Sequence, residues 1–176
     1  MNDAFPDLQH LRFDAPHLAA FTANTLDDLD IVHQMALKMN CAPLFALSEW
    51  ADVRLSRAEH GSFLFINNYL DDPIETTLAR AGQDLLAGNP VRLAARRGAI
   101  LPIDWQVREN VTLHFITSEI NAVMDDGATL TLLTDQPDFV AELTLTGYGC
   151  EGATPLGAGR VRVRGHSGAL VLRRAG

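Results

Sequence analysis

The stretch GSFLFINNYLDD, residues 61–72, decides the fold class of this chain. Residues 63–66 are aromatic and aliphatic side chains that favour a buried β-strand, whereas Asn67 and Asn68 are poor strand formers. Asparagine side chains bond to nearby backbone groups and tolerate left-handed backbone conformations. We therefore predict that a core strand ends at the two asparagines and that the chain turns there. The alternative is that Asn67 and Asn68 contact a sugar.

Outward from this stretch, polar and apolar residues alternate with a period of two from about residue 46 onward. Asp125-Asp126-Gly127 is a turn signal, and we expect the segments on either side of it to form a hairpin. In Arg160-Val161-Arg162-Val163-Arg164 we interpret the arginines as the solvent face of a strand. About nine short strands separated by turns are typical of a mainly β fold, here an antiparallel β-sandwich.

The part of the chain before these strands follows a different rhythm. Thr25 is a suitable N-cap, Asp28 follows three residues later, and Asn40 is a plausible C-cap, so we predict one N-terminal α-helix over residues 25–39. The sequence thus predicts an N-terminal extension and helix, residues 1–45, and a β-sandwich domain, residues 46–176. We expect the scattered hydrophobic residues between 5 and 21 to cover a sandwich edge or to drive self-association.

Composition limits the class of protein. The chain has 176 residues, of which 47% are hydrophobic and 20% charged, and this balance is typical of a globular protein with a real core. Its net charge of −8 disfavours nucleic acid and anionic membrane as partners, because phosphate attracts clustered basic residues. No signal peptide and no membrane span are indicated, so we expect a cytoplasmic protein in which Cys41 and Cys150 are free thiols. One disulfide between them is the alternative.

Motifs for metal, nucleotide or nucleophilic chemistry are weak. The six histidines show no pair at metal-ligand spacing, and no G-x-S-x-G elbow occurs, so we predict neither a metal site nor a cofactor. The glycine-rich stretch 147–152 lacks the following helix that a phosphate loop needs, and we expect its glycines to serve a turn with positive φ.

Carbohydrate binding is the chemistry for which the sequence offers candidate residues. The rings of Trp50, Tyr69 and Trp105 could stack on a sugar, although we expect at least one tryptophan to lie in the core. Among the carboxylates, Glu119 is the least ordinary because it sits at a strand end, but a structural role is favoured for it. The candidate sugar-binding set is therefore these four residues together with the two asparagines.

Three segments in this order resemble the region downstream of the catalytic barrel in bacterial β-galactosidases of glycoside hydrolase family 35. They are GSFLFINNY (residues 61–69), ILPID (residues 100–104) and VTLHFITSE (residues 111–119). Asp104 replaces the usual Asn of the second segment, and Asn110 stands where Gly is common. The resemblance covers about residues 46–145 and implies a β-domain with a galactoside-cleaving parent enzyme.

The resemblance also implies what this chain lacks. The family has its catalytic glutamates at strand ends of a (β/α)8 barrel, one of them in an Asn-Glu dipeptide. This sequence has no Asn-Glu dipeptide, and it is too short for a barrel of roughly 250 residues. We therefore expect a non-catalytic accessory domain or fragment whose partner is a catalytic barrel or a second copy. The alternatives are a freestanding carbohydrate-binding module with a galactoside ligand, and a small hydrolase with its own site.

Overall fold

The computed structural model describes residues 9–12, 19–22 and 44–175. Contacts divide the chain into two compact units, residues 1–44 and 45–176, which we describe separately. In the first unit, β1 (Gln9–Arg12) pairs antiparallel with β2 (Ala19–Thr22). The predicted helix over residues 25–39 lies outside the described residues, and the role expected for the hydrophobic residues between 5 and 21 stays a prediction.

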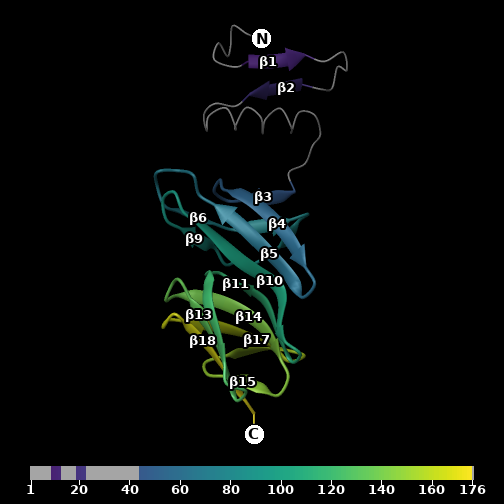
Figure 1. Ribbon diagram of the computed structural model, residues 1–176, viewed down its shortest axis with the longest axis vertical. Coiled ribbons are helices and arrows are strands. Elements are labelled where there is room, and N and C mark those ends of the chain that lie inside the picture. The colour runs from purple at the N-terminus through teal and green to yellow at the C-terminus, as the bar shows by residue number, and fades with distance from the viewer. Residues whose placement is uncertain (1–8, 13–18, 23–43, 176) are drawn as a thin grey trace. The chain divides into compact units, whose positions relative to one another are not determined.

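The second unit is mainly β, as the alternating sequence predicts, and its largest element is an antiparallel sheet of seven strands (Figure 1). In spatial order the strands are β16 (Thr154–Gly157), β17 (Arg160–Gly165), β14 (Phe139–Leu145), β11 (Val111–Ile116), β10 (Gly98–Arg108), β5 (Gly61–Asn67) and β4 (Asp52–Ala58).

Three smaller sheets pack with the large one. The first has the order β12 (Ile120–Asp125), β13 (Thr129–Thr134), β18 (Ala169–Arg174) and β15 (Tyr148–Cys150). The second has the order β3 (Phe45–Leu47), β7 (Leu78–Arg80) and β8 (Gln83–Asp84), and the third pairs β6 (Ile74–Thr76) with β9 (Val91–Leu93). In Figure 1, β3, β6 and β9 lie toward one end of the long sheet and β13, β18 and β15 toward the other.

The prediction of about nine strands is wrong, because the second unit holds 16 strands in several sheets. Many of them have only two to four residues, too few for an alternating pattern to show. The segment from Ile74 to Arg80, which is uninterrupted in sequence, is one such case. It divides into β6 and β7 because the Thr77 N–H bonds to Ser48 Oγ at 2.9 Å instead of joining a sheet.

The predicted hairpin is confirmed, since β12 and β13 pair antiparallel with Val123 opposite Leu132. Its turn is held by the Gly127 N–H, which donates to Asp125 Oδ1 at 2.9 Å, and Gly127 has φ of 89°. The glycine-rich stretch also behaves as expected at two positions, because Gly147 and Gly152 both have φ of 70°. In the part of the chain that the structure describes, no helix is long and apolar enough to cross a membrane.

Two separate clusters of buried side chains use the same seven-stranded sheet. The C-terminal cluster joins β11, β14 and β17 to β13 and β18 of the four-stranded sheet; Leu113, Leu143 and Leu172 are its fully buried members on three of these strands. The N-terminal cluster joins β5 and β10 to the short strands β6, β7 and β9; Leu64 and Leu101 are buried there. Strands β10 and β11 contribute to both clusters or border both, so they connect the two cores.

The exit of β5 explains the asparagines of the opening stretch. The strand ends at Asn67, and the Asn68 side chain is 1% exposed. Asn68 Nδ2 donates to the carbonyls of Asp72 (2.8 Å) and Ala94 (3.0 Å), and its Oδ1 accepts from the Leu70 N–H (2.9 Å). The predicted strand end and turn are therefore confirmed, and the turn ties β5 to the segment before β10.

Two glycines of the same region lie at points of close approach between strands. A Cβ on Gly61 would lie 2.7 Å from the Trp105 Cα, and Gly61 has φ of 152°, which side chains rarely adopt. A Cβ on Gly98 would lie 2.2 Å from Asn67 Oδ1, because Gly98 is the strand partner of Asn67. Gly61 and Gly98 thus lie where β5 and β10 approach each other closely.

Candidate functional site

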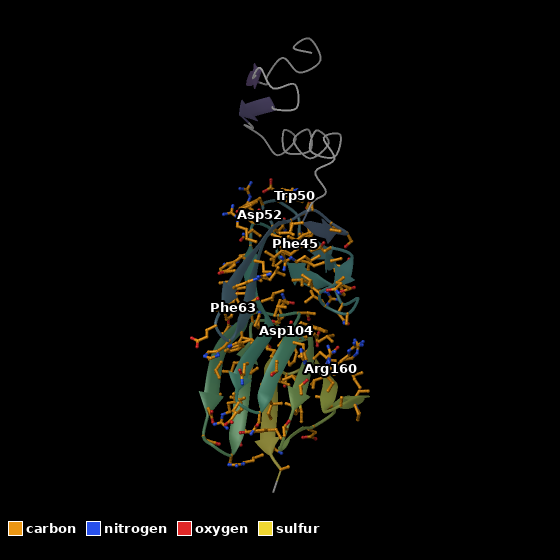
Figure 2. All side chains as sticks on the ribbon, turned by 90° about the vertical axis from the view of Figure 1, so that its right-hand side faces the viewer. Phe45, Trp50, Asp52, Phe63, Asp104 and Arg160 are labelled. Carbon is orange, nitrogen blue, oxygen red and sulfur yellow. The ribbon has the colours of Figure 1, made fainter. Side chains whose placement is uncertain are left out.

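An exposed aromatic pair stands at one end of the second unit. Trp50 precedes β4 and is 38% exposed, and Tyr69 follows β5 and is 52% exposed; their ring centroids are 6.5 Å apart at an interplanar angle of 46°. The pairing of β4 with β5 sets Asp52 opposite Asn67 and thereby brings both rings to the same end. Figure 2 shows Trp50 and Asp52 there, with Asp104 and Arg160 further along the molecule.

The segment that carries Trp50 is held by polar contacts to β6. The Glu49 N–H donates to Thr76 Oγ1 (3.0 Å), and Glu49 Oε2 accepts from the Glu75 N–H (3.2 Å). The backbone beside Trp50 is thus fixed, while the ring remains open to solvent. Two apolar ring faces near polar groups are what a sugar-stacking platform requires.

The structure brings four of the six sequence candidates to this end but leaves only the two rings available. Asn68 uses its amide on three backbone groups, so it holds the turn. Asn67 is half-buried, with its side chain packed over Gly98. The exposed part of the candidate set is therefore Trp50 and Tyr69.

Trp105 belongs to the core side of the sheet. Its half-buried ring packs against the C-terminal cluster and lies 6.1 Å from the Phe63 ring, centroid to centroid. Trp105 pairs with Leu113 in the sheet, and the preceding Asp104 has φ of 48°. The expectation that at least one tryptophan packs in the core is met by Trp105.

Glu119 lies in the connection between β11 and β12, at the rim of a surface pocket of about 290 Å³. Its backbone carbonyl accepts from the Asp135 N–H at 2.9 Å, and the residue as a whole is half-exposed. Gly98, the strand partner of Asn67, lines the same pocket.

A chain of polar side chains that the sequence patterns did not indicate crosses three neighbouring strands. Asp104 Oδ1 lies 2.7 Å from His114 Nδ1, and His114 Nε2 lies 2.8 Å from Thr144 Oγ1. Carboxylate, imidazole and hydroxyl follow in the order used by hydrolase triads. Their sequence separations of 10 and 30 residues carry no motif. Only the register of β10, β11 and β14 brings them together.

A buried carboxylate lies next to the polar series of Asp104, His114 and Thr144. Glu142 is 3% exposed, and its carboxylate forms ion pairs with Arg162 at 2.9 Å and with Arg160. Thr144 of the polar chain is the strand partner of Arg160. The predicted solvent face of β17 is thus confirmed for exposed Arg160 and Arg164, whereas Arg162 is partly covered.

A third polar group joins the hairpin turn to β15. Arg108 forms an ion pair with Asp125, bonds to the Tyr148 hydroxyl and lies 5.9 Å from the centre of the Tyr148 ring. The Gly127 N–H and then Arg108 lower the pKa of Asp125, because both stabilise its charged form. The arrangement fixes the hairpin turn against β15.

Cys150 has a free thiol in a half-buried position. Burial, and to a lesser extent the negative charge of Glu151, raises the pKa of the Cys150 thiol. Its sequence partner Cys41 lies outside the described residues. Among the described residues, His, Cys, Asp and Glu form no group of three or more that could hold a metal ion.

No protein-family model matches the sequence, and no curated protein is significantly similar to it.

Proposed function

We propose that this chain is a non-catalytic accessory β-domain of a bacterial family 35 β-galactosidase, or a separately encoded equivalent, in which the large and small sheets form the layers of a β-sandwich. Its role is to support the catalytic barrel or the assembly of subunits. A cytoplasmic location is part of this proposal.

One observation carries the proposal. The three segments that resemble the family correspond to β5, the middle of β10, and β11 with the connection after it, and these are neighbours in the seven-stranded sheet. Leu64, Leu101 and Leu113, one from each segment, are fully buried. Residues of this kind specify packing, so at these three positions the resemblance follows the core of a scaffold.

An apolar pair on the same strands supports a docking role. Phe65 is the strand partner of Ile100, and both side chains remain exposed although β5 and β10 lie inside the sheet. Large apolar side chains exposed side by side favour an interface. We assign this Phe65–Ile100 pair to contact with the barrel.

Co-expression of a tagged chain with a family 35 barrel from the same genome tests the proposal. We expect stoichiometric co-elution, and we expect β-galactosidase turnover only in fractions that contain the barrel. Phe65→Thr with Ile100→Thr should weaken the complex. Val123→Thr with Met124→Thr, exposed apolar residues on the edge strand β12, is the control. The proposal is contradicted if the tagged chain elutes without the barrel, or if it cleaves a chromogenic galactoside in the absence of the barrel.

The aromatic pair favours carbohydrate binding as a second candidate function. An exposed tryptophan beside an exposed tyrosine matches the stacking platform that a carbohydrate-binding module needs. Titration of tryptophan fluorescence with galactosides tests it, and Trp50→Phe should remove the response while Trp105→Phe leaves it. No response at millimolar sugar would end this candidate.

A further inference from the structure

A polar pocket lies between connections that come from distant parts of the chain. The pocket of about 290 Å³ is lined by residues 91–94 and 97–99 at the β9–β10 connection, residues 117–119 after β11, and residues 135–136 after β13. The first group belongs to the N-terminal half of the unit and the last to the C-terminal half. We call it the seam pocket, because its walls come from both halves.

The walls of the seam pocket are tied to one another. The Asp135 N–H donates to the Glu119 carbonyl at 2.9 Å, and the Gln136 N–H donates to Ser118 Oγ at 3.0 Å. Gln136 Nε2 donates to the Arg92 carbonyl at 2.9 Å. These three bonds link all three connections, so the pocket exists before any ligand arrives. A preformed site binds without the cost of ordering its walls.

The charged side chains of the pocket are left available by this arrangement. Arg97 and Asp135 are exposed, Glu119 is half-exposed, and none of the three forms an ion pair within residues 44–175. Arg92 is already engaged, because its Nε pairs with Glu75 Oε2 at 2.9 Å. Arg97, Glu119 and Asp135 therefore all line one pocket, and none of the three has its charge neutralised by an ion pair within residues 44–175.

This pattern of donors and acceptors defines the class of ligand. An anion would meet two carboxylates and a cation would meet the guanidinium of Arg97, so strong charge of either sign is disfavoured. A hydroxyl group both donates and accepts, and a neutral polyol can bond to Arg97, Glu119 and Asp135 together. The volume stands at the small end of ligand sites, roughly 300 Å³, which suits one sugar ring.

A second pocket borders the seam pocket. A neighbouring pocket of about 190 Å³ shares Arg92, Thr117 and Gln136 with it and extends to Asp138 and His166, whose Oδ1 and Nδ1 lie 3.0 Å apart.

We propose that the seam pocket binds a neutral sugar unit through its hydroxyl groups, with Arg97 donating and Glu119 and Asp135 accepting. This site is separate from the Trp50–Tyr69 pair and does not depend on association with a barrel. Its lining residues include no aromatic ring, so tryptophan fluorescence does not report on it.

Nuclear magnetic resonance of the ¹⁵N-labelled full chain tests the inference. Methyl β-D-galactopyranoside and methyl β-D-glucopyranoside are titrated in the millimolar range, with sodium sulfate as the anionic probe. We expect saturable shifts of the Arg97, Ser118, Glu119 and Asp135 amides with at least one of the two sugars and none with sulfate. Shifts with sulfate alone, no saturable shifts, or shifts confined to the residues around Trp50 and Tyr69 overturn it.

Variants separate this site from the others. Arg97→Ala with Glu119→Gln should weaken sugar binding at least about tenfold, because charge-assisted hydrogen bonds are lost. Trp50→Ala is the control and should leave binding at the seam pocket unchanged. The changed side chains reach solvent, and an otherwise unaltered amide spectrum establishes that the variant is folded. Unchanged affinity in the folded double variant contradicts the inference, and neither variant should alter co-elution with a barrel.

Discussion

The two halves of the second unit close their cores by different means. The C-terminal cluster lies between the large sheet and a four-stranded sheet, where Leu130 pairs with Leu172 and the β13–β18 ladder runs without a register shift. The N-terminal cluster is covered by strands of two or three residues, and polar side chains such as Asn68, Thr76 and Asp84 hold the connections between them. The C-terminal half therefore depends on sheet pairing, and the N-terminal half depends on side-chain anchors.

Short strands can still enclose a core when polar side chains anchor the connections between them. The Asp84 carboxylate accepts from the Leu86 N–H and the Gly88 N–H, both at 2.8 Å, and Leu86 becomes fully buried. Each such anchor satisfies backbone groups that a longer strand would satisfy through its ladder. The N-terminal half should therefore be sensitive to single polar substitutions, and the C-terminal half to the loss of apolar volume.

The largest effect is expected from a cavity in the C-terminal core. Leu143→Ala removes a fully buried side chain of β14 and should lower the free energy of unfolding by about 2–5 kcal/mol. Urea denaturation followed by circular dichroism measures it. Leu156→Ala, at an exposed position of the edge strand β16, is the control. A loss below about 1 kcal/mol for Leu143→Ala would contradict the described packing.

The anchor Asn68 is expected to come next. Asn68→Ala leaves the carbonyls of Asp72 and Ala94 and the Leu70 N–H without their partner, and should cost about 2–3 kcal/mol in the same assay. Asn67→Ala, one residue earlier and half-buried, should cost clearly less. Equal losses in the two variants would mean that the anchor role assigned to Asn68 is wrong.

A smaller effect is expected at the buried carboxylate of β14. Glu142→Gln keeps the shape but removes the charge that pairs with Arg160 and Arg162, and should cost about 1–2 kcal/mol. The value is below that of a fully buried pair because both arginines reach solvent and stay hydrated. The control is Arg164→Gln. Arg164 lies on β17 together with Arg160 and Arg162 but forms no ion pair in the described residues, so its loss should change stability little. A neutral result for Glu142→Gln would show that the ion pairs contribute nothing net.

The smallest effect is expected on the reactivity of the Cys150 thiol. Its alkylation rate is best measured in a Cys41→Ser background, where Cys150 is the single cysteine. Its pKa is raised by burial, so folded protein should react with iodoacetamide at pH 8 more slowly than protein unfolded in urea. The raised pKa stabilises the folded state below the ordinary thiol pKa of about 8.5, and this contribution is lost as pH rises through the folded-state pKa. Equal alkylation rates in folded and unfolded protein would contradict the burial.

The sequence predicts this molecule well where the period-two pattern is long. The strands that contain Leu64, Leu113 and Leu143, the hairpin at Gly127 and the turn at Asn68 could all be predicted from local residues. The short strands could not, because two or three residues leave no pattern and their pairing depends on distant anchors such as Ser48 on Thr77. The polar chain of Asp104, His114 and Thr144 could not be predicted either, because only the register of three long strands brings its members together.

Among the site residues predicted from sequence, the fold decides which are exposed and which lie close together. Trp50 and Trp105 are the same residue type, and only the register of the strands leaves one exposed and the other packed on Phe63. Glu119 was singled out as a strand-end carboxylate, but Arg97 and Asp135 join it only through the folded connections. Residue type thus predicted which chemistry was available, while tertiary structure decided where it is assembled.

Native-state hydrogen exchange tests most directly the central claim, that β5, β10 and β11 join the two cores into one cooperative body. The amides of Leu64, Leu101 and Leu113 should exchange only through global unfolding, with the same free energy as the amide of Leu143 in β14. If the amides of β5 and β10 exchange through a separate, lower-energy opening while β14 stays protected, the two halves fold independently and the claim is contradicted.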